Sequence, residues 1–278
     1  MRRSTTSRSG TPPSSTPMTF GKPSRPSWRS ARPSSTGPSV IPALRALVAY
    51  PAIALSTLFF GGIAVIGSWL PDRWQVPDRA ATVWARSFLI VAGVRFEVEG
   101  REHLRPERPQ VIVANHLSNL DPMVSWLALQ PIHYRFMAKK EVFRIPFFRT
   151  VIKAMHMVKV DREAGAGGYE FINQQIRRVF DLGLSLLIYG EGTRSRTHDV
   201  KQFKKGPFVI AEAADAPILP VTIVGTELAW PPGDWRMYGG RARVVIHPLV
   251  EQAGTIEEMR SQIETTIRAT YDDLASGA

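Results

Sequence analysis

The apolar positions of this 278-residue chain follow two patterns that meet near residue 94. Before that point, Ala46–Leu70 is a run of 25 residues without a charge, and residues 80–94 form a shorter apolar stretch interrupted by Arg86. After it, short runs rich in β-branched residues alternate with stretches of helical periodicity. The first pattern is typical of a membrane-embedded helix, and the second predicts strands interleaved with helices.

Strands that alternate with helices along a chain predict an α/β fold, in which helices cover both faces of a sheet. The predicted strands are residues 95–98, 111–114, 134–137, 157–160, 186–189, 219–224 and 243–247. The predicted helices are residues 122–129, 146–155, 169–182, 207–215 and 256–274. We therefore expect one α/β domain over residues 95–278, preceded by a membrane-associated helical element over residues 43–94.

The long apolar run can be given a topology. At about 1.5 Å per residue, a helix over residues 46–70 exceeds the ~30 Å hydrocarbon core. Gly61–Gly62 weakens its middle and allows a bend. If this helix crossed the bilayer below a cytosolic domain, the basic N-terminus would lie outside, against the positive-inside tendency. We predict a two-helix element, residues 46–70 with 78–94, that enters one leaflet without crossing. The alternative is a buried core helix.

Residues 1–42 form a basic tail. It holds seven Lys and Arg residues and no Asp or Glu, which leaves +4 of the net +11 for the remainder. Its Ser, Thr and Pro content predicts disorder, with either a passive role or contact with anionic lipid headgroups. Nucleic acid is not an expected partner, because few aromatic residues accompany the basic ones. The absence of Cys from the sequence excludes disulfides and thiolate chemistry.

The first candidate for catalysis is His116. The apolar strand 111–114 runs into Asn115-His116, and a helix is predicted to begin at Asp121-Pro122. Histidine titrates near neutral pH and can accept a proton from an alcohol, particularly when a carboxylate fixes its tautomer. Asp121 is close enough across a turn to do this. The alternative is that Asp121 is only a helix cap and His116 an ordinary loop residue.

A second loop suggests anion binding. The strand 186–189 is followed by Gly190-Glu191-Gly192-Thr193-Arg194. Glycines let the backbone approach an anion closely, and Arg binds phosphate oxygens through two hydrogen bonds. A solvated charged turn is the alternative reading. Three further segments are candidates for the site, but each could equally have a purely structural role. They are the strand that ends in Asp161-Arg162, the basic pair Lys139-Lys140, and the apolar segment Pro217–Gly225.

The order of these segments resembles the successive motifs of the glycerolipid acyltransferase family. They read Asn-His-x4-Asp, Lys-Lys-Glu-x-Phe-x-x-Pro-Phe-Phe, Val-Asp-Arg, Glu-Gly-Thr-Arg-Ser and Pro-Ile-Leu-Pro-Val. The similarity covers roughly residues 95–250 and is closest to the 1-acylglycerol-3-phosphate, or PlsC-like, acyltransferases. It implies a mixed sheet covered by helices. One departure is Tyr189-Gly190, where the family has Phe-Pro, and a Gly in place of Pro is expected to loosen this loop.

The resemblance implies an O-acyltransferase of phospholipid biosynthesis at the cytoplasmic face of the inner membrane. His116, held by Asp121, is expected to deprotonate the free hydroxyl of lysophosphatidic acid, which then attacks the thioester of acyl-CoA or of an acyl carrier protein. The expected acceptor-binding residues are Asn115, Lys139, Arg162, Glu191, Gly192, Thr193 and Arg194. No metal or cofactor is expected. The alternatives are acylation of glycerol 3-phosphate, a lyso-ornithine lipid or a glycolipid, hydrolysis, and non-catalytic lipid binding.

Overall fold

The structure is a computed structural model that describes residues 40–71, 75–160, 165–195, 197 and 199–276. Most of the predicted basic tail therefore lies outside the described residues. Two helices come first, α1 (Val40–Gly67) and α2 (Val76–Ala92). The strands that follow are β1 (Val94–Glu99), β2 (Val111–Ala114), β3 (Tyr134–Lys139), β4 (Val158–Val160), β5 (Ser185–Tyr189), β6 (Ile218–Val224) and β7 (Gly240–Ile246). The later helices are α3 (Asp121–Ala128), α4 (Pro146–Ala154), α5 (Gly165–Asp181), α6 (Gly206–Ala213), α7 (Thr226–Ala229) and α8 (Ile256–Ser276), with 3-10 turns at Arg101–His103 and Val142–Arg144.

The strands form one sheet in the order β1-β7-β6-β2-β5-β3-β4. Neighbouring strands pair in parallel, except that β6 and β7 are antiparallel. The predicted mixed sheet is thus confirmed. Strand β2 lies between β5 and β6 and is buried at every position. Because both of its faces are covered, all of its residues are apolar.

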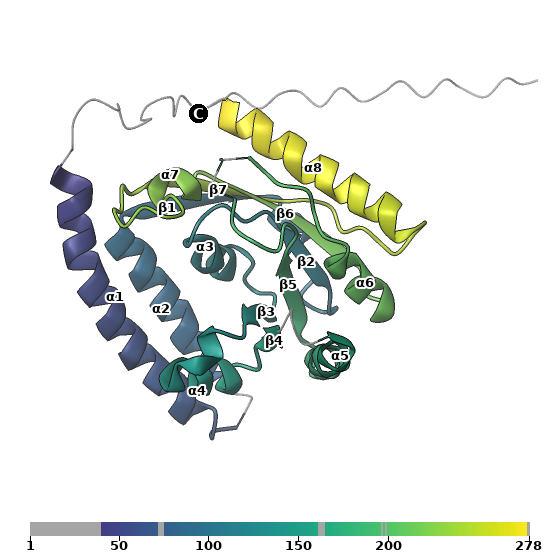
Figure 1. The fold of residues 1–278 in the computed structure, drawn as a ribbon, viewed down its shortest axis with the longest axis horizontal. Helices are drawn as coiled ribbons and strands as arrows, with labels where there is room; N and C mark the ends of the chain where they lie inside the picture. Colours follow the sequence, from purple (N-terminus) through teal and green to yellow (C-terminus); the bar gives the residue numbers. More distant parts are fainter. Residues whose placement is uncertain (1–39, 72–74, 161–164, 196, 198, 277–278) are drawn as a thin grey trace, which may run out of the picture.

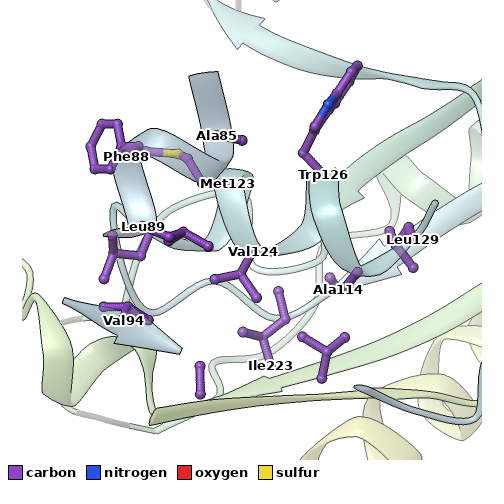
Figure 2. Packing of buried hydrophobic residues seen from close by; sticks show 14 of the residues in the cluster. Ala85, Phe88, Leu89, Val94, Ala114, Met123, Val124, Trp126, Leu129 and Ile223 are labelled. Carbon is purple, nitrogen blue, oxygen red and sulfur yellow. The ribbon is translucent and has the colours of Figure 1, made fainter. Parts of the chain in front are cut away.

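Alternate residues of β2 serve the two faces of the sheet, as the two-residue period of a strand requires. Val111 and Val113 belong to a core shared with α6 and α8, whereas Ile112 and Ala114 belong to a core shared with α2 and α3. Figure 1 shows α6 and α8 on the opposite side of the sheet from α2 and α3. In Figure 2, Val124 of α3 lies close to the side chains of the sheet. Helices therefore cover both faces.

Helix α1 buries its small residues and exposes its large apolar ones. It is the one helix in the described part of the chain that is long and apolar enough to cross a membrane, yet only 17% of its most apolar window is buried. The buried positions include Ala46, Ala49 and Ala64. The exposed apolar positions are Val40, Ile41, Leu44, Leu47, Val48, Leu55, Leu58, Phe59 and Ile66. This distribution contradicts a buried core helix and indicates association with a membrane.

The two glycines of α1 have different surroundings. The helix runs unbroken from Val40 to Gly67, so Gly61–Gly62 does not interrupt it. A Cβ on Gly61 would lie 2.6 Å from the ring of Phe147 in α4, whereas one on Gly62 would meet nothing within 4 Å. Gly61 is therefore needed for the close approach of α1 and α4.

Helices α1 and α2 pack side by side next to the α/β domain (Figure 1). Polar contacts connect each of them to that domain. Asp78 at the start of α2 pairs with the buried Arg135 of β3, with 3.1 Å between Oδ1 and Nη2. On α1, the Tyr50 hydroxyl donates a hydrogen bond to the carbonyl of Trp235 at 2.8 Å. The apolar face of α1 is thus held in a defined orientation relative to the sheet.

Candidate active site

Three neighbouring strand ends form the centre of the site. Strands β5, β2 and β6 run in parallel side by side, so their carboxyl ends lie at one edge of the sheet. The residues that follow them include His116 after β2, Glu191 after β5 and Thr226 after β6. Reactive side chains in open α/β folds are commonly displayed at this edge. The sheet therefore brings the two loops suggested by the sequence together.

His116 and Asp121 form the expected pair. Nδ1 of His116 lies 2.7 Å from Oδ2 of Asp121. The aspartate side chain is only 1% exposed and that of the histidine 17%. Because a carboxylate can only accept a hydrogen bond, Nδ1 carries a proton in this pair and Nε2 keeps its lone pair. The imidazole is thus in the tautomer required for a general base acting through Nε2.

The ring of His116 is held on a second side. It stacks on Tyr189 at the end of β5, with 3.9 Å between ring centroids and 12° between ring planes. The main chain of this loop is also tied to the neighbouring loop, because the Ser195 amide donates to the carbonyl of His116 at 2.9 Å. The base therefore has contacts that fix both its position and its plane.

Asp121 accepts hydrogen bonds at both carboxylate oxygens. The amides of Leu117 and Ser118 each donate to Oδ2 at 2.8 Å, and the Thr226 hydroxyl donates to Oδ1 at 2.5 Å. Sequence reasoning missed Thr226, which lies beyond the apolar segment Pro217–Gly225. The sequence signal for it is the glycine just before it, Gly225, at the end of β6. Gly225 has a φ of 89°, a backbone conformation that residues with a side chain rarely adopt, so it marks a sharp turn.

Asn115 has a structural role, which corrects its assignment to acceptor binding. Its side chain is fully buried. The amide nitrogen donates to the carbonyl of Ile223 and the amide oxygen accepts from the Ile223 N–H, both at 2.8 Å. These two bonds tie the end of β2 to β6, so the side chain is occupied within the protein and does not face the cavity.

Glu191 is likewise an internal group. It is 2% exposed, and its Oε1 accepts a hydrogen bond from the backbone N–H of His116 at 3.2 Å. Its Oε2 has no hydrogen-bond partner among the described residues. Burial raises the pKa of Glu191 from 4.5 to about 8, because the charged form is poorly solvated there. Its contact is with the backbone of the base, and direct binding of an acceptor is contradicted by this burial.

The rest of this loop does face the cavity. Gly192, Thr193 and Arg194 line it together with His116. The guanidinium of Arg194 is exposed and donates to the side-chain oxygen of Asn119, two residues before Asp121. Lys204 lines the same cavity and was missed by the sequence reasoning, since it lies in a segment that reads as a polar loop. Two residues with cationic side chains therefore line the cavity together with the histidine.

Gly190 is tightly packed, contrary to the expectation of a loosened loop. Its N–H donates to the carbonyl of Ala114 at 2.8 Å, and its carbonyl accepts from the Lys204 amide at 2.8 Å. A Cβ built on it would lie 2.5 Å from the ring of Phe203. The ring occupies the space next to the glycine, so the missing proline is compensated by packing and by backbone hydrogen bonds.

The cavity itself has a volume of about 760 Å³ and a mainly apolar lining. Its walls come from α1, α2, α3, α4, α6 and the strands β3 to β5. Thr57 is the one residue with a hydroxyl that α1 contributes. The other apolar and aromatic lining residues include Phe60, Trp84, Trp126, Phe136, Phe147, Phe148, Met155 and Met157. Such a space fits a hydrocarbon chain that extends away from His116.

Two predicted acceptor-binding residues stay predictions. Arg162, with Asp161, lies outside the described residues. Lys139 ends β3, which runs parallel to β5 and next to it, and its side chain also lies outside the description. Within the described ranges, no group of three or more His, Asp or Glu side chains is placed to hold a metal ion.

Comparisons with known proteins agree with this geometry. A family model described as Acyltransferase matches residues 95–224. The chain is 33% identical, over 148 residues, to a 1-acyl-sn-glycerol-3-phosphate acyltransferase of Limnanthes douglasii, covering 53% of this chain and 51% of that protein. It is 26% identical to a protein of the same description from Pseudomonas aeruginosa, covering 85% and 94%. The crystal structure of PlsC from Thermotoga maritima, a 1-acyl-sn-glycerophosphate acyltransferase, superposes with a TM-score of 0.74 at 26% identity, covering 85% and 97%.

The family model, the relatives and the solved structure all support the PlsC-like glycerolipid acyltransferase family for this chain. The chain spans about half the length of the Limnanthes relatives, but nearly all of the Pseudomonas and Thermotoga proteins. The family resemblance predicted from the order of the motifs is therefore confirmed.

Proposed function

We propose that this protein transfers an acyl chain from a thioester to the free hydroxyl of lysophosphatidic acid, forming phosphatidic acid. Nε2 of His116 takes the proton of the acceptor hydroxyl while Asp121 stabilises the imidazolium that forms. The hydroxyl oxygen forms a bond to the thioester carbonyl carbon, and the carbon–sulfur bond breaks. The departing thiolate takes the proton from the imidazolium, so the free base is regenerated and no acyl-enzyme is formed.

One observation carries the proposal, namely that the His116–Asp121 pair opens onto a large apolar cavity. A buried aspartate 2.7 Å from the histidine supports base catalysis, and about 760 Å³ of mainly apolar space supports a lipid substrate. A solvated loop histidine with a nearby helix cap would not need such a cavity. The names of the similar proteins support the same reaction and the same acceptor.

The phosphate of the acceptor is assigned to Arg194 and Lys204. Both residues are exposed and line the cavity that His116 also lines. Guanidinium and ammonium groups bind phosphate oxygens through charge-assisted hydrogen bonds. Gly192, which has no side chain, lets the backbone of the Gly192-Thr193 segment approach the same phosphate. Arg162 and Lys139 are proposed as further cations of this site, on the family pattern.

The thioester donor is acyl-CoA or an acyl carrier protein, and its fatty acyl chain is assigned to the apolar cavity. Four residues of α1, Thr57, Phe60, Gly61 and Ala64, contribute to the cavity lining. The helix with the exposed apolar face is therefore also a wall of the lipid site. A substrate in the bilayer would reach the site without its hydrocarbon chain crossing bulk water.

We further propose that the two-helix element lies in one leaflet on the cytoplasmic side of the inner membrane. The exposed apolar face of α1 and the polar contacts that hold α1 and α2 on the domain support this arrangement. Its test is a single cysteine placed in the basic tail and treated with a membrane-impermeant thiol reagent on intact cells. We expect no labelling until the cells are opened, and labelling of intact cells would refute the arrangement.

The reaction is tested with purified protein, labelled acyl-CoA or acyl carrier protein, and a panel of acceptors. The panel contains lysophosphatidic acid, glycerol 3-phosphate, a lyso-ornithine lipid, a lysoglycolipid and no acceptor. We expect acyl transfer that depends on the acceptor and is fastest with lysophosphatidic acid. A faster rate with another acceptor would show that lysophosphatidic acid is not the preferred substrate. Transfer of the labelled acyl group to water alone would indicate a hydrolase. Lipid binding without turnover would indicate a non-catalytic lipid-binding protein.

A further inference from the structure

The hydroxyl of Thr226 is the fourth donor to the aspartate beside the base. Asp121 Oδ2 accepts from Nδ1 of His116 and from the amides of Leu117 and Ser118. Asp121 Oδ1 accepts from Thr226 Oγ1 at 2.5 Å. Both Thr226 and Asp121 are fully buried, so water does not compete for this bond. The threonine lies on the first turn after β6, more than 100 residues from the motif that it completes.

We propose that Thr226 is a positioning residue of the proposed acyl transfer, which holds the Asp121 carboxylate in the orientation that fixes the tautomer and plane of His116. This inference rests on the proposed function. It adds a third member to the predicted pair, so the base, its carboxylate and the hydroxyl form a chain from β2 through α3 to the end of β6.

A carboxylate bound at only one oxygen can rotate about its Cβ–Cγ bond. In Asp121 the oxygen that faces His116 is also held by two backbone amides, so rotation is opposed there. The Thr226 hydroxyl opposes the same rotation at the other oxygen, through a charge-assisted hydrogen bond. Without the Thr226 hydroxyl, Oδ1 would be a buried acceptor with no hydrogen-bond donor. The carboxylate would then rotate toward another donor, which would weaken the hydrogen bond between Oδ2 and His116.

The backbone around Thr226 fixes the position of the hydroxyl. Gly225 precedes it with a φ of 89°, and a Cβ on Gly225 would lie 2.4 Å from the carbonyl oxygen of Arg241 in β7. The carbonyl of Thr226 itself accepts from the amide of Trp230 at 3.0 Å. As a β-branched residue, threonine has few side-chain rotamers. The hydroxyl is therefore aimed by a turn that only glycine adopts easily.

Strand β6 offers a matched control. Thr222 lies within β6, four residues before Thr226, and is also fully buried. Its hydroxyl lies 2.8 Å from Nε2 of His247, which follows β7, and so is paired with a different side chain from that of Thr226. Replacing either threonine with valine removes one buried hydroxyl and leaves the side-chain volume nearly unchanged, at Thr222 within β6 and at Thr226 just after it. Only the change at Thr226 acts on the carboxylate of the proposed pair.

The experiment measures kcat and KM for Thr226→Val, Thr226→Ser and Thr222→Val in the acyl-transfer assay. Loss of a hydrogen bond to a charged group predicts a fall in kcat of about 10- to 100-fold for Thr226→Val, with KM changed less than about twofold. Thr226→Ser keeps the hydroxyl and should retain kcat to within about threefold. Thr222→Val should have the wild-type kcat. Thermal unfolding of all three variants checks that the two valine variants fold equally well.

The outcomes separate the inference from the function on which it rests. If the wild-type chain transfers no acyl group, the proposed function fails. If the wild type is active, two results would show that Thr226 is not a positioning residue. One is a wild-type kcat for Thr226→Val, and the other is a fall in kcat for Thr226→Ser as large as that for Thr226→Val. A double-mutant cycle gives a second measurement: Thr226→Val should have little further effect in an Asp121→Asn background. A full additional loss there would also overturn the inference.

Discussion

The two loops that build the site differ in how firmly they are held. The loop after β2 is fixed by the buried Asp121, which accepts from two of its amides and from His116. The loop after β5 is anchored at Gly190 and Glu191 but then becomes exposed at Thr193 and Arg194. A group that moves a proton needs a fixed position, whereas a group that binds a phosphate on a long lipid can adjust to it.

This difference predicts which kinetic constant each loop controls. A change in the fixed loop should affect kcat, because it alters the transition state more than binding. A change at the exposed tip of the other loop should affect KM for the acceptor. The anchored part of that second loop, Gly190 and Glu191, should affect stability and the shape of the site.

The largest effect is expected for His116→Ala. Loss of the general base removes a factor of about 10²–10⁴ in kcat, and loss of orientation adds to this. The measurement is acyl transfer from labelled acyl-CoA to lysophosphatidic acid. His133→Ala is the control, because His133 also lies beside an aspartate, with 3.3 Å between its Nδ1 and Oδ2 of Asp78. Near-normal turnover by His116→Ala would rule out the assignment of the base.

Removal of the exposed cation should act mainly on binding. Arg194→Ala is expected to raise KM for the phosphorylated acceptor by about 10- to 100-fold, the effect of losing one hydrogen bond to a charged group. The value of kcat should change much less. Lys204→Ala should shift KM in the same direction, and Arg108→Ala, which breaks a surface ion pair with Glu251, should leave it unchanged. If Arg194→Ala changes kcat alone, the division between the loops is wrong.

Restoring the proline typical of the family should harm this protein. Gly190→Pro removes the N–H that donates to Ala114 and places a ring against Phe203, so we expect a loss of about 1–3 kcal/mol in stability and lower activity. Gly190→Ala should show the packing part of this effect alone. Gly62→Ala is the control, since a Cβ there meets nothing. A fully active and equally stable Gly190→Pro protein would show that Phe203 does not determine the loop.

Most of the fold was predictable from the sequence. The predicted strands and helices match the structure to within a few residues, except that α1 begins at Val40 and not at Ala46, α5 begins at Gly165, and the four-residue α7 was missed. Apolar runs and helix starts such as Asp121-Pro122 are local signals, which explains this agreement. The pairing of His116 with Asp121 was also local, because only a turn separates them.

The parts of the site that depend on distant contacts were not predictable. Thr226 reaches Asp121 only because β6 lies beside β2. The order of strands in a sheet cannot be predicted from the local pattern of apolar and polar residues. The family resemblance predicts acceptor binding for Asn115 and Glu191, yet both side chains are buried within the protein. Gly190 depends on Phe203, which follows it by 13 residues. In each case the tertiary partner decides what the residue does.

The smallest effect concerns the stability of the anchored part of the second loop. Glu191 has a pKa raised by burial from 4.5 to about 8, so between these pH values it is protonated in the folded state and ionised in the unfolded state. Unfolding then releases a proton, and the wild type loses stability as pH rises through this window, by at most about 1.4 kcal/mol per pH unit. Glu191→Gln has no carboxyl group at this position and therefore lacks this pH dependence. The denaturant midpoint of Glu191→Gln minus that of the wild type should increase from pH 5 to pH 8 and then level off. Glu251→Gln, at an exposed carboxylate, should track the wild type at every pH. If the Glu191→Gln and wild-type curves stay parallel, the side chain is solvated in solution, and the β5 loop is less firmly anchored than the comparison with the β2 loop requires.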